Sequence, residues 1–360
     1  MNRRHGGDYT AFMHFEVPTA LEYFSSLVAD DTSFSLTEVA LSLAQDEFPD
    51  LDLQEVLAEI DALADRLKRR LPDDAVPVQR LRTLNRYFFH ELGFAGNVND
   101  YYDPYNSCLN IVLQSRRGIP ISLAVLYIEL ASQIGLNARG VSFPGHSLIK
   151  LKMPQGEVVI DPFTGTSLSR EELDERLAPY KRQQGLVGDF DMPLGLFLQA
   201  STPREVVARM LRNLKEIYRT GQDWQRYLLV SQRLVILLPQ SLEELRDRGL
   251  AHAELGNAEE AIADLAAYVR RAERAEDRIE IAGRLEALRH SGAPPRLHWA
   301  QGAARHPGES RIRPPGSGAR RPGGLRCGRC DRPSGLAPAA PAWPGPRRRP
   351  RRSRRSRCRS

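Results

Sequence analysis

Two residues of this chain, His146 and Asp161, have the types and the spacing of an acid–base pair. His146 opens the segment HSLIKLK and Asp161 lies in the next segment, EVVIDPF, and both segments have the composition of short strands. In an active site that works through a cysteine thiolate, a histidine on one strand acts as the base, and an Asp or Asn on the next strand orients it. The two residues therefore predict chemistry on an amide or acyl bond, provided that a nucleophile stands beside them.

The same two residues also have simple structural explanations. His146 follows Pro144-Gly145, so a hydrogen-bonded histidine at the start of a strand is the alternative to a reactive one. Asp161 precedes Pro162, and Asp-Pro is common at the beginning of a turn. Two hypotheses follow: a working pair in a pocket that includes Gly145, and a vestigial pair.

Two side chains are candidates for the nucleophile. Ser122 lies in the first turn of the helix predicted to begin at Pro120, from which it could reach His146, although helix geometry turns it about 200° away from Pro120. Cys108 lies early in the preceding helix, where a helix dipole would lower the pKa of its thiol. The alternative for Cys108 is a small buried residue.

Polar residues of that preceding helix could line the same pocket. Arg116 and Arg117 stand at its end and could bind an acidic group, but one of them is expected to complement the negative end of the helix dipole. Asn106 or Ser107 is expected to be the N-cap, which makes any contact of Asn106 with a ligand secondary.

Three helices are predicted before this region. Ser35 and Glu38 form an S-x-x-E capping box at the start of two helices over residues 35–71. A third helix near 77–91 is expected to stop before Gly93. The second helix carries one apolar stripe, predicted to be core, of Leu53, Leu57, Ile60, Leu63 and Leu67.

The region around the candidate pair predicts a buried helix that leads into an antiparallel sheet. Pro120 fits the first turn of an almost entirely apolar helix, ISLAVLYIELASQIGL. The segments ARGVSF, HSLIKLK and EVVIDPF follow as strands, separated by Pro-Gly and Pro-Gln-Gly turn signals.

The residues from about 203 to 288 are helical throughout and contain a repeat. The stretch ELRDRGLAHAELGNAEEAIADLAAYVRRAE resembles a tetratricopeptide unit, with Gly256 between paired helices, Ala261 at their crossing and Tyr268 in the second helix. A degenerate copy precedes it, offset by about 35 residues through Gly221. Because a free solenoid needs three or more units, this block is expected to pack on the first domain.

Several motifs together resemble the SirB1 family: ELGFAGN, YYDPYNS, LQSRRGIPISLAVLY, FPGHSL and IDPFTG, followed by the helical repeat. The resemblance covers roughly residues 30–290. It implies an α+β fold, in which a transglutaminase-like (papain-like) helix-plus-antiparallel-sheet domain precedes an all-α tetratricopeptide-like domain and a disordered tail. It also implies a regulatory or scaffolding role.

The resemblance places Pro120 where a transglutaminase-like domain has its cysteine. Four residues align this helix and the next strand with the transglutaminase-like pattern: Gly118, Ala124, Gly135 and Arg139. Loss of the cysteine is usual in the SirB1 family. The implied pocket, apart from the pair, consists of Asn106, Arg116, Pro120, Ser122 and Gly145.

Charge is distributed unevenly along the chain. Residues 292–360 hold 18 Arg, no Lys and two acidic residues, a net charge of +16, so residues 1–291 carry −10 of the overall +6. Such a Pro- and Gly-rich tail is expected to be disordered and to bind polyanions only non-specifically, and a shifted reading frame in GC-rich DNA would produce the same composition. Specific recognition of nucleic acid is not expected.

Other classes of protein are disfavoured. No run of about 18 apolar residues predicts a membrane span, and MNRRHGGDYTAF lacks the apolar segment of a secretory signal, so the cytoplasm is expected. Cys327 and Cys330 resemble half a zinc site, but no partner pair follows at finger spacing. No metal and no cofactor are predicted.

The sequence thus divides into a flexible N-terminus (1–30), a transglutaminase-like domain (31–195), tetratricopeptide-like repeats (200–290) and a disordered Arg/Pro/Gly-rich tail (291–360). The first hypothesis is a non-catalytic interaction or regulatory protein that binds a protein or peptide through its repeats and the transglutaminase-like groove. The alternative is a hydrolase or acyl-transfer enzyme that uses His146 and Asp161 with a nucleophile other than cysteine. The missing cysteine favours the first.

Overall fold

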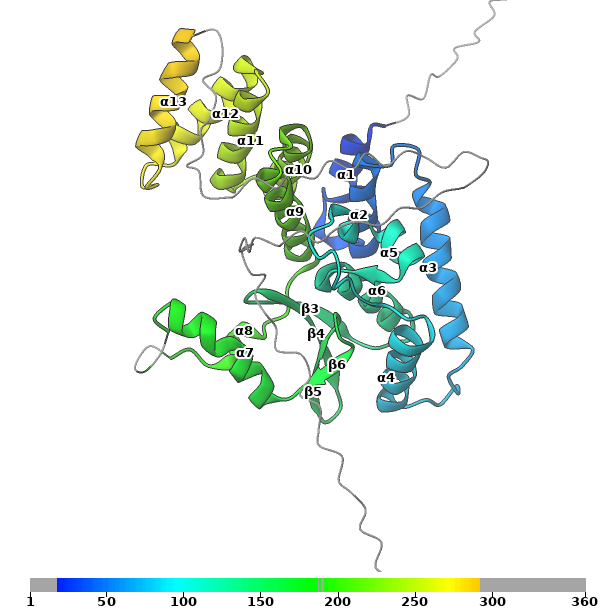
Figure 1. Cartoon of the computed structure of the whole chain (residues 1–360). Helices are drawn as coiled ribbons and strands as arrows, with labels where there is room; N and C mark the ends of the chain where they lie inside the picture. Colours follow the sequence, from blue (N-terminus) through cyan, green and yellow to red (C-terminus); the bar gives the residue numbers. More distant parts are fainter. Residues whose placement is uncertain (1–17, 187, 189–190, 292–360) are drawn as a thin grey trace, which may run out of the picture. The chain divides into compact units, whose positions relative to one another are not determined.

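The computed structural model of this chain describes residues 18–186, 188 and 191–291 (Figure 1). The predicted disordered tail, its Cys327–Cys330 motif and the first 17 residues lie outside the described residues. Among the described residues, no helix is both long and apolar enough to cross a membrane. Nor do three or more His, Cys, Asp or Glu side chains gather there in a way that could hold a metal ion.

The first part of the structure is a group of helices: α1 (Ala20–Leu27), α2 (Leu36–Ser42), α3 (Leu53–Lys68) and α4 (Pro77–Asn85). Helix α1 corrects the expectation that residues 1–30 are flexible throughout. It is capped by a reciprocal pair of hydrogen bonds between Thr19 and Glu22, and Phe24 is fully buried against the remaining helices.

The other predicted helices of this part are confirmed. Ser35 caps α2, and the stripe on α3 is buried except at Leu57, which is half-buried. After α4 the helix continues to Glu91 with wider, π-type turns and stops before Gly93, whose φ is 74°. Four short helical turns complete this region: 3₁₀ segments Asp31–Ser33, Leu43–Asp46 and Pro104–Ser107, and the π segment Arg86–Glu91.

The predicted buried helix is α6 (Pro120–Gln133), with Pro120 at its first position. Ten of its residues are buried, and it packs against helices on one side and against the sheet on the other. The shorter helix before it is α5 (Leu109–Ser115). Its N-cap is Cys108, which corrects the expected cap at Asn106 or Ser107, because those two residues belong to a 3₁₀ turn.

The antiparallel sheet follows α6, as predicted, and its strands are neighbours in sequence order: β3 (Ala138–Phe143), β4 (His146–Met153), β5 (Gly156–Asp161) and β6 (Thr166–Leu168). Sequence reasoning missed β6. A separate pair of two-residue strands, β1 (Ala95–Gly96) and β2 (Arg117–Gly118), runs parallel beside the start of α6.

Helices make up the rest of the described chain. Two of them, α7 (Arg170–Gln183) and α8 (Leu194–Phe197), were not predicted, and α7 contains Pro179 within its length. The repeat region is helical, as predicted, and its helices pack in sequence order: α9 (Pro203–Thr220), α10 (Trp224–Leu237), α11 (Leu242–Glu254), α12 (Ala258–Arg271) and α13 (Arg278–Ser291) (Figure 1).

Two hydrophobic clusters hold these elements together. The larger one runs from Phe24 through α6 and the sheet to α9, α10 and Ala251 of α11. The smaller one extends from Ala253 to Leu288, over α11 to α13. Because α9 and α10 share the core of the transglutaminase-like part, the expectation that the repeats pack on the first domain is confirmed.

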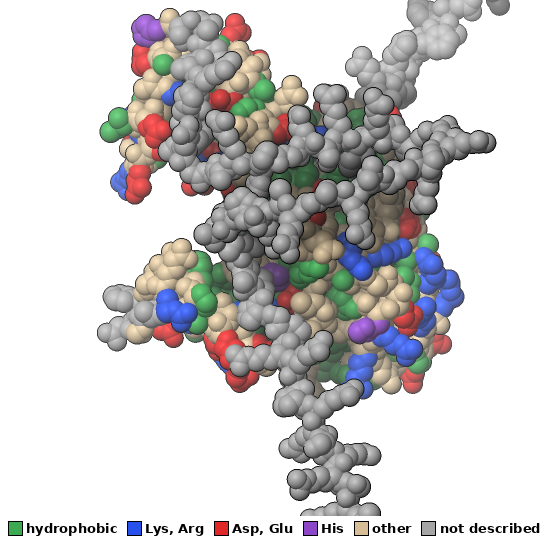
Figure 2. Space-filling model, viewed as in Figure 1, with side chains coloured by type: hydrophobic (Ala, Val, Ile, Leu, Met, Phe, Trp, Pro, Cys, Tyr) green, Lys and Arg blue, Asp and Glu red, His purple; other side chains and the backbone are tan. Residues whose placement is uncertain are grey.

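One face of the molecule carries many cations. Figure 2 shows Lys and Arg side chains gathered over α3 and α4, in the lower right of that view. They include exposed residues in or directly after these two helices, namely Arg66, Lys68, Arg69, Arg70, Arg82 and Arg86. Acidic side chains are interspersed, since Asp65 pairs with Lys68 and Glu91 with Arg70 and Arg86.

Candidate functional site

The hairpin β3–β4 positions His146. Pro144 and Gly145 form its two-residue turn, and Gly145 has a φ of 71°, which a glycine adopts without strain. Phe143 and His146 pair directly across this turn. Nothing lies within 4 Å of the position that a Cβ on Gly145 would take, so Gly145 shapes the turn and leaves open space there.

The pairing of β4 with β5 brings Asp161 to His146. Ile149 pairs with Ile160, so Asp161 lies opposite Leu148, and His146 is two residues further along the same face of β4. The Nε2 atom of His146 and Oδ1 of Asp161 are 2.8 Å apart. The juxtaposition expected from the two strand segments is therefore present, with His146 only 4% and Asp161 only 2% exposed.

A third side chain, Arg176 of α7, completes this cluster. Its Nη1 lies 3.0 Å from Oδ2 of Asp161, and the backbone N–H of Phe163 donates to Oδ1 at 3.0 Å. Burial opposes ionisation of Asp161, but the hydrogen bonds from His146, Arg176 and Phe163 outweigh it and lower its pKa. Asp161 is therefore an anion that orients the His146 ring through Nε2, and any proton transfer by His146 would run through Nδ1.

Sequence reasoning missed Arg176. It lies within the charged helix REELDERLAPYKRQ, where arginines and carboxylates alternate as on any solvated helix face. Arg176 differs from the other arginines of α7 because the folded structure brings it to Asp161 at the end of β5.

Phe163 links this cluster to the start of α6. The backbone N–H of Gly96 donates to the Phe163 carbonyl at 2.9 Å, and that of Asn97 donates to the Gly118 carbonyl at 2.9 Å. A Cβ on Gly96 would come within 2.4 Å of the Phe163 ring, so only glycine fits this close approach. Pro120, two residues after Gly118, is buried at the first position of α6.

The Ser122 hydroxyl hydrogen-bonds backbone groups at the N-terminus of α6. Its Oγ is 2.6 Å from the Asn106 carbonyl and 3.1 Å from the Ile119 carbonyl, and it accepts from the Ile119 N–H at 3.2 Å. Ser122 has no exposed surface. Its hydroxyl is therefore directed to backbone groups at the helix start and not toward His146.

The pKa of the Cys108 thiol is shifted upward, opposite to the predicted direction. Burial raises its pKa to about 12, and the carboxylates of Glu47, Asp103 and Asp46 raise it further. The expectation that the dipole of α5 lowers this pKa is wrong, because desolvation and three acidic neighbours dominate. Cys108 is thus a buried, protonated thiol.

Asn106 holds together the loop before α5. Its Nδ2 donates to the Asp100 carbonyl at 2.7 Å, and its Oδ1 accepts from Asn97 Nδ2 at 2.9 Å. Asn106 is 4% exposed. Its side chain therefore serves backbone and loop contacts.

Arg116 ends α5 in a left-handed conformation, with a φ of 58°. Its guanidinium lies 4.8 Å from the centre of the Phe94 ring and 3.8 Å from Glu59. Arg117 donates to the Gly93 carbonyl at 2.7 Å. The structure thus places Arg116 over Phe94 and beside α3.

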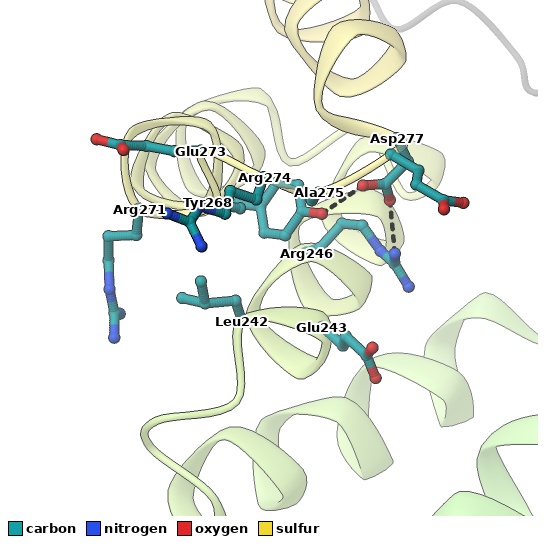
Figure 3. Close-up of a pocket in the computed structure, with 11 residues that line it drawn as sticks. Leu242, Glu243, Arg246, Tyr268, Arg271, Glu273, Arg274, Ala275 and Asp277 are labelled. Atoms are coloured by element: carbon teal, nitrogen blue, oxygen red, sulfur yellow. Dashed lines mark hydrogen bonds and ion pairs between the residues drawn. The ribbon is translucent and has the colours of Figure 1, made fainter.

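A second candidate site lies in the repeats. A cavity of about 890 Å³ opens between the start of α11, the end of α12 and the segment before α13 (Figure 3). Arg246 and Tyr268 both point to Asp277, to which each is hydrogen-bonded. The cavity is lined by charged residues with a few apolar ones: Leu242, Glu243, Arg246, Tyr268, Arg271, Ala272, Glu273, Arg274, Ala275, Glu276 and Asp277.

Two family profiles match this chain. That of the transglutaminase-like superfamily covers residues 54–212, and that of a tetratricopeptide repeat covers residues 214–286. Together they account for the helix-plus-sheet part and for most of the helices behind it. No solved structure matches the chain.

Several bacterial proteins are similar over most of their length. A UPF0162 protein of Xylella fastidiosa strain 9a5c is 39% identical over 246 residues, which are 68% of this chain and 86% of that protein. UPF0162 protein YchA of Escherichia coli K12 is 28% identical over 228 residues, 62% of this chain and 80% of YchA. Protein SirB1 of Salmonella typhimurium is 26% identical over 224 residues, 61% of this chain and 80% of SirB1.

Proposed function

We propose, from the premise that this chain belongs to the UPF0162 family, that it is a non-catalytic interaction protein whose transglutaminase-like domain and repeats bind a partner protein or peptide. The observation that carries the proposal is the buried Pro120 at the first position of α6, where the resemblance places the nucleophilic cysteine. Proline has no nucleophilic side chain, so the residues around it decide whether another group takes that role.

Neither alternative nucleophile is activated. The Ser122 hydroxyl is bound to backbone groups at the start of α6, and the Cys108 thiol is buried with a raised pKa. A thiol so far from ionisation at neutral pH is a poor nucleophile. These observations support a pocket in which His146 and Asp161 are retained for their contribution to structure and binding.

The helices behind the domain support an interaction role. Tetratricopeptide repeats generally mediate binding between proteins, and stacked helical repeats present extended surfaces to a partner. The cavity next to Tyr268 lies on these helices, and Arg271, Glu273 and Arg274 on its rim are exposed. We propose that this rim is part of the partner-binding surface.

One observation favours the alternative of an enzyme. Asp161 is an anion that holds Nε2 of His146, which is the arrangement of a base oriented by a carboxylate. A positioned histidine contributes roughly 10²–10⁴-fold to a reaction rate, so an activated water could act without the cysteine. The 4% exposure of His146 weighs against this alternative, since a substrate must reach it.

Site-specific photocrosslinking in cells tests the interaction role. We place benzoylphenylalanine at Glu273, on the rim of the cavity, and at Arg270, an exposed neighbour that does not line it. We expect one defined protein to be crosslinked from position 273 and not from 270. The double variant Arg271→Glu/Arg274→Glu should lose this crosslink, whereas His146→Gln should keep it.

The enzyme alternative is tested separately with purified full-length protein. We expect no hydrolysis or transfer on a panel of amide, ester and thioester substrates above the rate in buffer. Turnover by the wild type that disappears in His146→Gln would reject the non-catalytic proposal, whatever the crosslinking shows.

A further inference from the structure

Arg209 brings a cation from the helical part of the chain to the His146 hairpin. It lies on α9, and its Nη1 and Nη2 atoms both donate to the Phe143 carbonyl at 3.2 Å. Phe143 is the residue that pairs with His146 across the β3–β4 turn. The guanidinium is therefore held at the end of the hairpin where His146 begins β4.

The charge of Arg209 is not matched by a carboxylate within the described part of the chain. Other cations of α9 have one, since Arg204 pairs with Asp31 and both Arg212 and Lys215 pair with Glu244. Burial lowers the pKa of Arg209, because the charged guanidinium is partly removed from water. A partly buried cation without an anion has lost hydration that an anionic ligand would replace.

Tyr101 stands in the same neighbourhood. Its ring centre is 5.9 Å from that of Phe163, which in turn is 6.4 Å from that of His146. Burial raises the pKa of Tyr101, so that its hydroxyl is protonated and can donate a hydrogen bond. Tyr101 is nevertheless 37% exposed, so a ligand can approach it from solvent.

Asp161, the acidic residue paired with His146, is already engaged. Asp161 accepts from His146 and Phe163 through Oδ1 and from Arg176 through Oδ2. Its negative charge is thereby directed to Arg176 and His146 and not to Arg209. The neighbourhood therefore offers a guanidinium and a phenol hydroxyl as donors beside the buried His146–Asp161 pair.

We propose that Arg209 and Tyr101 form a carboxylate-binding site beside His146. A guanidinium has five N–H donors, so Arg209 keeps N–H groups for a carboxylate besides the two that donate to Phe143, and the Tyr101 hydroxyl supplies a further donor. The ligand is a peptide that presents either an acidic side chain or its C-terminal carboxylate. That the ligand is a peptide rests on the proposed function, whereas the carboxylate site itself does not.

Histidine NMR of the full-length protein tests the carboxylate site. With ¹³C-labelled histidine, the His146 signal is identified by its loss in His146→Gln, and sodium acetate is titrated against sodium chloride at equal ionic strength. We expect acetate, and not chloride, to shift this signal saturably. The same titration should be about tenfold weaker or undetectable in Arg209→Gln, because a charge-assisted hydrogen bond is lost.

Two more variants keep the test decisive if Arg209→Gln fails to fold. Tyr101→Phe removes only a hydroxyl and should weaken acetate binding severalfold, and Arg209→Lys should keep part of it as a point charge. Arg219→Gln, on the same helix but paired with the exposed Glu216, is the matched control and should bind as the wild type does. Absence of a saturable shift in the wild type, or an equal shift in Arg209→Gln or Tyr101→Phe, would overturn the proposal.

Three short peptides distinguish the source of the carboxylate: acetyl-Ala-Ala-Glu-amide, acetyl-Ala-Ala-Ala with a free C-terminus, and acetyl-Ala-Ala-Ala-amide. Binding of either carboxylate peptide through Arg209 supports the proposal and names the source. Equal binding of the uncharged peptide contradicts it. The crosslinking from Glu273 does not involve this site, so failure of the carboxylate site and failure of the interaction role give different results.

Discussion

Asp161 is the centre of the buried polar cluster, because it accepts hydrogen bonds from His146, Arg176 and the Phe163 backbone. A buried carboxylate is stable only when it is paired in this way, and removing one partner leaves the others unsatisfied. The cluster joins β4, β5 and α7, so its loss should affect both the stability of the fold and the orientation of His146.

We predict that Asp161→Asn lowers the free energy of unfolding by about 3 kcal/mol at pH 7, the usual cost of breaking a buried ion pair. The pKa of Asp161 is lowered in the folded protein, so this carboxylate stabilises the fold fully above the pKa of an unfolded Asp, about 3.9. The contribution is lost as the pH falls through the pKa that Asp161 has in the folded protein. The difference between variant and wild type, measured by urea unfolding, should therefore shrink below about pH 4.

The control for this prediction is Asp191→Asn. Asp191 pairs with Lys181 but is 58% exposed, and such surface pairs contribute about 0–1 kcal/mol. If Asp161→Asn costs no more than Asp191→Asn at pH 7, the cluster does not stabilise the fold.

A second residue-scale prediction concerns Cys108, whose burial raises its pKa to about 12. Because the thiolate is the reactive form, iodoacetamide at pH 7.5 should leave Cys108 unmodified in the folded protein and modify it rapidly in urea. Mass spectrometry of the peptide that contains Cys108 measures both states. Fast alkylation of the folded protein would show that the Cys108 thiol is accessible and reactive, and Cys108 would again be a candidate nucleophile.

At the scale of elements, the crossing of α11 and α12 depends on the absence of a side chain at Gly249. A Cβ there would lie 2.8 Å from Leu265 and 2.9 Å from Asp264, closer than real Cβ contacts. Leu265 on α12 is fully buried at this contact. The paired helices of the repeat can approach each other this closely only because α11 has a glycine in its middle, despite the cost of glycine to helix propensity.

We predict opposite effects for two Gly→Ala substitutions in the repeat helices. Gly249→Ala should lower the free energy of unfolding by about 1–3 kcal/mol through overpacking. Gly283→Ala on α13, where a Cβ would meet nothing within 4 Å, should raise it by about 0.5–1 kcal/mol through helix propensity. Thermal unfolding of both variants measures the difference, and equal shifts would contradict the close packing of α11 and α12.

At the scale of the whole described region, the helical part and the transglutaminase-like part share one core. Arg233 of α10 is 1% exposed and binds both carboxylate oxygens of Asp46, at 2.6 and 2.8 Å. It also lies 4.9 Å from the centre of the Phe24 ring on α1. The division at residues 195–200 stays a prediction, since the packing joins the two parts across it.

We predict that Arg233→Ala destabilises the protein by about 3 kcal/mol, because it leaves Asp46 without its cation. It should also increase hydrogen exchange in α1, which packs against α10 through Phe24. Arg219→Ala, which breaks an exposed pair on α9, is the control and should change the free energy of unfolding by less than about 1 kcal/mol. An unchanged α1 in Arg233→Ala would show that this helix is held by apolar contacts alone.

Local patterns in the sequence determined most of the architecture. The apolar stripe of α3, the proline that opens α6 and the Pro144-Gly145 turn each act within a few residues of the chain, so they could be recognised without a structure. The helical repeat could be recognised as well, because the sequence resembles itself at a fixed offset. The strand segments also brought His146 and Asp161 together, since consecutive strands of a hairpin sheet lie side by side.

Only the tertiary structure decided what surrounds that pair. Arg176, Arg209 and Arg233 look alike in the sequence, yet one binds Asp161, one lacks a carboxylate among the described residues and one is buried against Asp46. The carboxylates that raise the pKa of Cys108 include Asp46 and Glu47, which are distant in sequence. Burial and charge depend on contacts between such distant residues, and for this reason they could not be deduced from local patterns.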